Sequence, residues 1–150
     1  MLKHPRHLIR DTALYDLWKA GNYAEHTVDD AVRVCAQLTA MFYEAHIPII
    51  RMGLNPTEDL SGGDAVGGAY HPALGELVRS RMMLDKARQL LEGTPHGSSV
   101  ILGVNSSDVS KMTGQHRCNI NTLKTELRLR SVKIREADVK SGEIAILSLD

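Results

Sequence analysis

The sequence predicts an α/β fold, with an α+β arrangement as the alternative. Short runs of apolar and β-branched residues alternate along the chain with longer segments whose apolar residues recur at helical spacing. Hydrophobic residues make up 43% of the 150 residues and aromatic residues only 4%, so an aliphatic core is expected. A segment with two glycines and a proline, residues 92–98, interrupts these patterns and divides the chain into parts 1–93 and 98–150.

The first elements are a short strand, predicted at residues 7–10, and a helix, predicted at 13–20. Asp11 or Thr12 can cap this helix, because their side-chain oxygens accept hydrogen bonds from the free amides of a first turn. Gly21 stands where a left-handed C-terminal cap is expected.

A second helix is predicted to begin after Thr27 and to end near His46, before Pro48. Asp30 lies three residues after Thr27, which is a weak form of the capping box. The apolar residues of this helix follow the i, i+3, i+4 spacing of one buried stripe. The stripe comprises Val28, Ala31, Val32, Cys35, Leu38 and Phe42.

A buried strand is predicted at residues 48–54. Ile49 and Ile50 are β-branched, which favours a strand. The run stops at Asn55, because a residue that precedes a proline, here Pro56, is disfavoured in helical space.

The connection after this strand is rich in glycine. Loops of this length inside a compact domain are usually functional or disordered. This one runs from a strand to a helix that Pro72 opens and that extends to about Leu91, so we expect it to be functional. It holds six of the 12 glycines of the chain: Gly53, Gly62, Gly63, Gly67, Gly68 and Gly75.

Three motifs follow one another over residues 49–78: IIRMGLNPTEDL, a glycine pair and GGAYHPALGELV. They resemble a segment of the radical S-adenosylmethionine (SAM) iron–sulfur oxidoreductases that are related to the Elongator catalytic subunit and often described as oxygen-independent coproporphyrinogen oxidase-like. The resemblance extends upstream through HPRHLIRDTALYDLWKAGNYAEHTVDDAV and downstream through SDVSKMTGQHRCNINTL, so it covers most of the chain.

The resemblance implies that residues 1–93 hold the last strand of a radical SAM barrel and the C-terminal extension of the family. The parent protein would use a [4Fe–4S] cluster on a CxxxCxxC motif and SAM. This chain lacks that motif and has only two cysteines, Cys35 and Cys118, whereas such a cluster needs three cysteine ligands. We therefore expect no cofactor and no independent catalysis here. The expected role is an accessory, substrate-presenting domain whose partner is the missing barrel of the same polypeptide.

Residues around the glycine-rich loop are candidates for contacting substrate or cofactor, because ligands of open α/β sheets gather beyond the carboxyl ends of the strands. Structural readings remain open beside this one. Arg51 can reach solvent or be a buried cation with a partner, Asn55 and Thr57 can cap a turn, and His71 can be a packing residue. The candidates are Arg51, Asn55, Thr57, Gly67, Gly68 and His71.

Residues 98–150 show a β-α-turn-α-β order, with helices at 107–112 and 118–127 and strands at 100–104, 132–135 and 143–147. This order is similar to the core of a KH RNA-binding domain. Gly114, Gln115, His116 and Arg117 stand where that domain has its GXXG loop, which clamps phosphates through backbone amides. Arg117 replaces the second glycine and adds a cation at the place of a phosphate.

The net charge is zero, but the charges are unevenly distributed. Residues 111–135 form a basic cluster with seven basic side chains and one acid, Glu126. One reading is an RNA-binding groove flanked by Lys111, Arg117, Lys124 and Arg128. A second reading is a solvated helix face. A third is a structural domain in which the cluster pairs with acids such as Glu58, Asp59 and Asp64.

Several other functions are not expected. No apolar run approaches the roughly 20 residues that a helix needs to span a bilayer, so we expect a cytoplasmic protein without a membrane partner. The seven histidines show no metal-ligand spacing, and no metal site is expected. No serine or cysteine lies in a nucleophile motif, and no acid–base constellation marks a catalytic residue.

Overall fold

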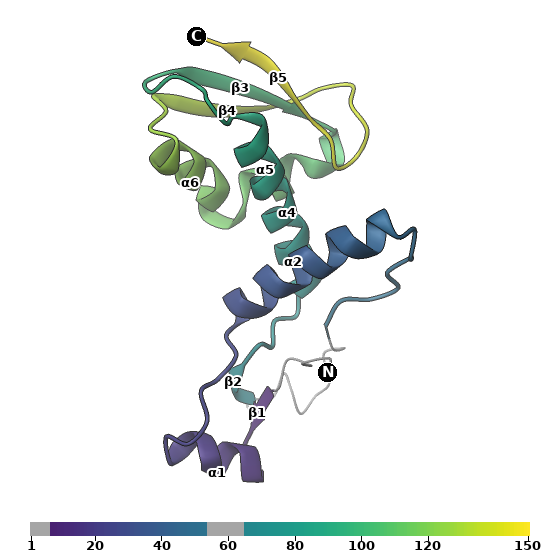
Figure 1. Cartoon of the computed structure of the whole chain (residues 1–150), viewed down its shortest axis with the longest axis vertical. Helices are drawn as coiled ribbons and strands as arrows, with labels where there is room; N and C mark the ends of the chain where they lie inside the picture. Colours follow the sequence, from purple (N-terminus) through teal and green to yellow (C-terminus); the bar gives the residue numbers. More distant parts are fainter. Residues whose placement is uncertain (1–6, 54–64) are drawn as a thin grey trace. The chain divides into compact units, whose positions relative to one another are not determined.

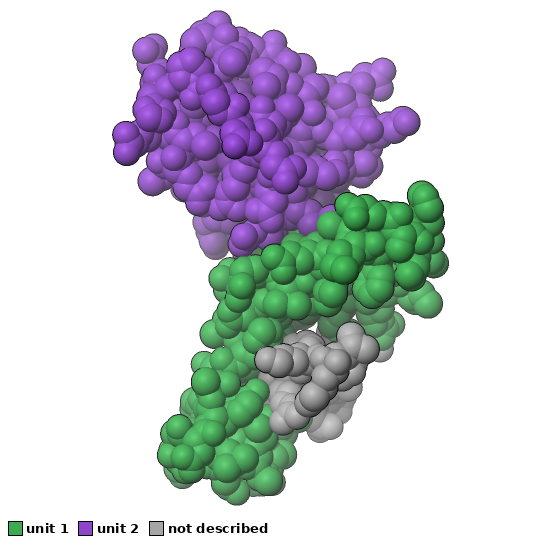
Figure 2. All heavy atoms as spheres, in the orientation of Figure 1, with its two compact units in different colours: residues 1–78 green, residues 79–150 purple. Residues whose placement is uncertain are grey.

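The computed structural model describes residues 7–53 and 65–150. The chain folds into two compact units, residues 1–78 and residues 79–150 (Figures 1 and 2). Both units combine helices with a small sheet, which confirms the α/β class.

Unit 1 contains a two-stranded antiparallel sheet of β1 (His7–Ile9) and β2 (Ala65–Gly68). Its helices are α1 (Ala13–Lys19) and α2 (Val28–Glu44), and α4 (Leu74–Leu90) begins in it. The predicted first strand and first two helices are therefore confirmed. So is the helix that was expected from Pro72 to about Leu91.

The predicted caps form as hydrogen bonds. The Tyr15 amide donates to Thr12 Oγ1 at 3.3 Å. Thr27 and Asp30 exchange two bonds, because the Asp30 amide donates to Thr27 Oγ1 at 3.1 Å and the Thr27 amide donates to Asp30 Oδ2 at 3.3 Å. Gly21 has a φ of +73°, as its left-handed cap position predicts.

The predicted strand at 48–54 is wrong over its described residues, 48–53, which form no strand. A strand needs a neighbour that takes up its backbone N–H and C=O groups. In unit 1 the neighbour of β1 is β2, which comes from the end of the glycine-rich segment. Ile50 is consequently 98% exposed rather than buried.

The buried side of α2 differs from the predicted stripe. Ala31 and Val32 are buried as expected, but Leu38 and Phe42 are 37% and 38% exposed. Small or short side chains further along the helix, Ala36 and Thr39, are buried instead. Because α2 carries apolar residues on two sides, periodicity alone could not decide which side turns inward.

Unit 2 contains a three-stranded sheet in the order β4-β3-β5, in which β3 runs parallel to β4 and antiparallel to β5. Figure 1 shows α5 and α6 on one face of this sheet. The predicted β-α-turn-α-β order is confirmed. Its elements are β3 (Ser99–Val104), η1 (Ser106–Asp108), α5 (Val109–Thr113), η2 (Gln115–Arg117), α6 (Cys118–Glu126), β4 (Ser131–Glu136) and β5 (Ile144–Leu149).

The core of unit 2 is aliphatic, as the composition predicts. Val100, Leu102 and Val104 alternate along β3 and are fully buried. They pack with Met112 of α5 and Leu123 of α6, among others. Burying a side chain of this size contributes about 1.5–3 kcal/mol, so this layer is the main source of stability in the unit.

Candidate functional site

The turn between α5 and α6 depends on left-handed backbone. Gly114, His116 and Arg117 have φ values of +75°, +51° and +62°. A Cβ atom on Gly114 would lie 3.0 Å from the Asn119 amide nitrogen and would also collide with Cys118 Sγ. Gly114 is therefore required both for its conformation and for the close approach of the next helix.

The backbone of Arg117 has the left-handed form that a glycine adopts readily. A non-glycine residue there costs about 1–2 kcal/mol. The Arg117 amide donates to the Gly114 carbonyl at 3.1 Å, and the Cys118 amide donates to the Gln115 carbonyl. His116 lies outside helical φ/ψ space within this turn, so the turn is a kink between α5 and α6 and not a regular helix start.

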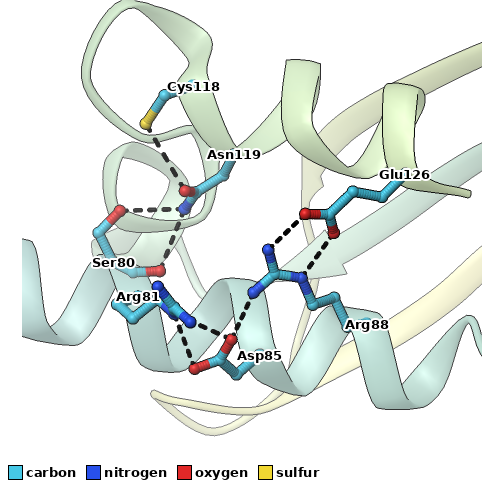
Figure 3. A network of polar contacts seen from close by, with 7 residues as sticks. All are labelled: Ser80, Arg81, Asp85, Arg88, Cys118, Asn119 and Glu126. Carbon is cyan, nitrogen blue, oxygen red and sulfur yellow. Dashed lines mark hydrogen bonds and ion pairs between the residues drawn. The ribbon is translucent and has the colours of Figure 1, made fainter. Parts of the chain in front are cut away.

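The side chain of Asn119 holds this turn in place through hydrogen bonds (Figure 3). Its side chain is buried, and Nδ2 donates to the Lys111 carbonyl at 3.0 Å and to the Ser80 carbonyl at 3.1 Å. Ser80 Oγ accepts from Asn119 Nδ2 at 3.0 Å and donates to the Lys111 carbonyl at 2.8 Å. One amide group thus joins α4, α5 and α6.

The ammonium group of Lys111 makes contacts within unit 2 and does not line an open groove. Its Nζ lies 2.9 Å from Oδ1 of the buried Asp108 and 2.8 Å from the Ser107 carbonyl. Asp108 Oδ2 accepts from Ser141 Oγ at 2.9 Å and from the Gly142 amide at 2.7 Å. Burial raises the pKa of Asp108, but the hydrogen bonds from Lys111, Gly142 and Ser141 outweigh it and hold that pKa below its usual value.

The single acid of the basic cluster is also paired (Figure 3). Glu126 accepts two 2.8 Å hydrogen bonds from Arg88 of α4, which lower the pKa of its carboxyl group. Arg88 also contacts Asp85 at 2.6 Å. Glu126 therefore cannot neutralise the other basic residues of the cluster.

Six exposed cations remain between residues 117 and 135, and two of them, Lys133 and Arg135, alternate along β4 with the core-facing Val132 and Ile134 and so lie on the opposite face of the sheet. The six make no ion pair with any residue in the described part of the chain, and the acids that could pair with them, Glu58, Asp59 and Asp64, lie outside it. The six are Arg117, Lys124, Arg128, Arg130, Lys133 and Arg135.

The candidate residues of unit 1 make separate contacts. His71 Nδ1 accepts from the Ala73 amide at 3.1 Å, at the start of α4. The Gly68 amide donates to Glu25 Oε2 at 3.1 Å, and the same carboxylate lies against Gly67. Arg51 is exposed. Asn55 and Thr57 lie outside the described residues.

Three features were not found from the sequence alone, and the ion pair of Lys111 with Asp108 is the first of them. The sequence gives only a weak indication of the role of Asn119, which is a polar residue beside Ile120 in the apolar stripe of α6. No sequence pattern indicates the contact of Glu25 with Gly68, because the two residues are 43 positions apart in the chain.

Unit 1 also exposes an apolar surface, here named the α2 apolar surface. Four of its side chains lie on α2 at the spacing i, i+4, i+7 and i+8, so they share one side of the helix. Two more follow the helix. The exposed fractions are 37% for Val34, 37% for Leu38, 62% for Met41, 38% for Phe42, 49% for Ile47 and 98% for Ile50.

The residues present do not fit an iron–sulfur cluster. Cys35 is half-buried in unit 1 and Cys118 is exposed in unit 2. Burial raises the pKa of the Cys35 thiol, which disfavours the thiolate that binds metals. No group of three or more His, Cys, Asp or Glu side chains within residues 7–53 and 65–150 could hold a metal ion.

Comparison with known proteins identifies one family. The family described as the Radical_SAM C-terminal domain matches residues 2–83, which is more than half of the chain. No curated protein and no solved structure matches the sequence. Within the described residues, no helix is both long and apolar enough to cross a membrane. The chain belongs to the Radical_SAM C-terminal domain family.

Proposed function

We propose that this chain is an accessory, substrate-presenting domain of a radical SAM iron–sulfur oxidoreductase and is not catalytic alone. Unit 1 docks on the radical SAM barrel of the parent protein. That barrel holds the [4Fe–4S] cluster and SAM, which supply the radical chemistry. The observation that carries the proposal is the α2 apolar surface in a chain of this family.

The α2 apolar surface has the properties of an interface. A surface helix usually turns its one apolar side toward the core. In α2 the buried residues are Ala31, Val32, Ala36 and Thr39, and larger apolar side chains remain exposed on another side of the same helix. Contiguous exposed apolar patches on soluble domains mark binding surfaces. The large side chains are therefore available to a partner.

Replacing Leu38, Met41 and Phe42 together with glutamine is expected to cost the isolated chain less stability per residue than a substitution in the core. Met41 is 62% exposed, and Leu38 and Phe42 keep 37% and 38% of their surface exposed, so only part of their apolar area contributes to the fold, and binding of the dye ANS should fall. Differential scanning fluorimetry and ANS fluorescence measure both effects.

The matched control is Val32→Gln, which puts the same polar side chain at a buried position of the same helix. It should lower the free energy of unfolding by about 2 kcal/mol or more. If the triple variant is destabilised as much as this control, the surface belongs to the core and the docking proposal fails.

Three of these cations, Arg117, Lys124 and Arg128, favour a second function, weak binding of RNA by unit 2. Lys124 lies seven residues after Arg117, about 10 Å along α6 and close to the same side of the helix. Arg128 lies beyond the end of α6, with a φ of +51°. These cations can contact successive phosphates. No aromatic residue follows Tyr70 in the sequence, so stacking adds nothing and we expect affinity of about micromolar at best.

Replacing Gln115 and His116 with aspartate should abolish binding of a fluorescein-labelled 12-nucleotide oligouridylate, because two carboxylates then face the phosphates. Fluorescence anisotropy measures the affinity. The control is Asn22→Asp with Gln37→Glu, which adds the same charge at exposed positions of unit 1 and should bind as the native chain does. Binding that survives the first change, or no binding by the native chain, would rule out this function.

Arg117→Gly separates binding from folding. It should raise the free energy of unfolding by about 1 kcal/mol, because glycine adopts the left-handed backbone without strain. The same change should weaken oligouridylate binding and reduce its salt slope by about 0.7. Weaker binding that comes with lower stability would contradict this account.

A further inference from the structure

The sheet of unit 2 has one face that no helix of residues 79–150 covers. Val100, Leu102 and Val104 of β3 are buried and pack with core residues of α4, α5 and α6. Figure 1 shows α5 and α6 on this one face. The side chains that alternate with the buried ones lie on the opposite face, here named the open sheet face. Its members are Ile101, Gly103, Lys133, Arg135, Ala137 and Leu147.

Apolar side chains form the centre of the open sheet face. A Cβ atom on Gly103 would lie 2.8 Å from Ala137 Cβ and 2.9 Å from Leu147 Cγ, so these two side chains close over Gly103 from the neighbouring strands. Ile146 pairs with Leu102 and Ser148 pairs with Ile101, which makes Leu147 the extra residue of a bulge. Leu147 keeps 49% of its surface exposed, so the apolar centre is accessible.

Two cations line one side of this apolar centre. In the parallel register Lys133 lies beside Ile101 and Arg135 lies beside Gly103, so both side chains share the open sheet face. Both are exposed, and neither forms an ion pair within the described part of the chain. The β4 side of the face therefore carries two positive charges without an anion.

The strands place one acid on the open sheet face, at its far corner. Asp150 exchanges two backbone hydrogen bonds with Ser99, at the end of β5 that lies across the sheet from β4. The distance from β4 is two strand spacings, about 10 Å. Asp150 Oδ2 accepts from Ser148 Oγ at 3.3 Å. This acid does not neutralise the two cations, and a partner needs carboxylates only on the β4 side.

The strand arrangement favours a cover on this face. β3 and β4 form a parallel pair, and parallel strands occur mostly in sheets that are covered on both faces. Three strands of six residues measure about 10 Å from edge to edge and about 20 Å along the strands. One α-helix of about 14 residues has these dimensions.

Charge and polarity decide which helix fits. Lys133 and Arg135 are two residues apart in a strand, a separation of about 7 Å. Carboxylates at positions i and i+4 of a helix are about 6 Å apart and match this spacing. An apolar stripe beside those carboxylates would cover Leu147 and Ile101. No aromatic residue follows Tyr70, so the face offers no platform on which the bases of a nucleic acid could stack.

We propose that the open sheet face binds an amphipathic helix of another protein. The apolar stripe of that helix packs on Ile101 and Leu147, and a row of carboxylates along one flank pairs with Lys133 and Arg135. The turn and helix of the RNA-binding candidates lie on the other side of the sheet. This inference therefore goes beyond the proposed function and does not depend on it.

The test titrates the full 150-residue chain with the peptide acetyl-AQLEALLEQLEAQL-amide and follows the amide signals by NMR. As a helix this peptide carries leucines on one side and three glutamates along one flank. Saturable shifts are expected in β3, β4 and β5. The same peptide with lysine in place of each glutamate should bind about tenfold more weakly at low salt.

Three results of this titration would overturn the proposal. The first is equal binding of the two peptides, and the second is a set of shifts confined to α2 or α6. The third is a shift of the three strands by oligouridylate and not by the glutamate peptide, because RNA would then be the occupant.

Lys133→Glu together with Arg135→Glu reverses the charge of the face. This variant should bind the glutamate peptide at least about tenfold more weakly, and the lysine peptide more tightly, than the native chain does. Arg10→Glu with Lys19→Glu makes the same change of charge at exposed positions of unit 1 and should bind both peptides as the native chain does. A preference for the glutamate peptide that survives the reversal would contradict the proposal.

Leu147→Gln tests the apolar centre and is the second variant should the charge reversal not fold. It should lower the affinity for the glutamate peptide about fivefold or more. Leu17→Gln, at an apolar residue of α1 that is 48% exposed, is its control and should bind normally. Binding unaffected by Leu147→Gln and by the charge reversal would overturn the proposal. So would a dimer of the native chain in sedimentation that the charge reversal abolishes, because a second copy would then cover the face.

Discussion

Replacing Asn119 with alanine is expected to lower the free energy of unfolding of unit 2 by about 2–3 kcal/mol. The change removes the buried amide that donates to the Ser80 carbonyl, the Ser80 hydroxyl and the Lys111 carbonyl, and each hydrogen bond contributes about 0.5–1.5 kcal/mol. For a unit of this size the loss corresponds to a fall in Tm of about 10 °C or more. Thermal unfolding followed by amide signals of unit 2 measures it.

Two further variants show whether hydrogen bonding is the cause. Asn119→Asp keeps the shape of the side chain but turns an acceptor toward the two carbonyls, so it should destabilise more than alanine does. Asn121→Ala makes the same change at an exposed position of α6 and should cost less than about 0.5 kcal/mol. If Asn119→Ala and Asn121→Ala cost the same, Asn119 does not hold the turn.

Replacing Asp108 with asparagine is expected to cost about 2–3 kcal/mol at pH 7. The variant leaves the Lys111 ammonium without its anion and weakens the hydrogen bonds from Ser141 and Gly142. Asp138→Asn, at an exposed position between β4 and β5, is the matched control and should change the free energy by less than about 0.5 kcal/mol.

The cost of Asp108→Asn should depend on pH. The folded state lowers the pKa of Asp108 below the ordinary 3.8, so the carboxylate stabilises the fold fully above pH 3.8. This stabilisation is lost as the pH falls below 3.8 and through the lowered pKa of the folded state. Urea unfolding between pH 2 and pH 7 should show the two proteins converging at the acid end. A difference that stays constant across this range would contradict the assigned role of the ion pair.

The sequence predicted local structure well, because capping and periodicity act over a few residues. Thr12, Thr27 with Asp30, and Gly21 take the positions that their side chains or backbone freedom predicted. The prediction of a strand at 48–54 is wrong over the described residues 48–53. Whether an apolar extended run becomes a strand depends on a partner strand, which no local pattern reveals.

The candidate sites were predicted less completely. The turn between the two helices was placed correctly at Gly114–Arg117 from the order of elements, and its role as a GXXG loop stays a prediction. The ion pair of Lys111 with Asp108 was missed, although the two residues are only three apart. What makes Asp108 a buried partner is its contact with Ser141 and Gly142, more than 30 positions away. Contacts of this length depend on the assembled fold.

Hydrogen exchange of the chain, with and without a radical SAM barrel of the same family that lacks its own C-terminal domain, tests the central claim most directly. We expect the barrel to slow exchange in α2 and at residues 47–50, where the α2 apolar surface lies. The variant with glutamine at Leu38, Met41 and Phe42 should lose this protection. Exchange that the barrel leaves unchanged in α2, or slows only in unit 2, would contradict docking through unit 1.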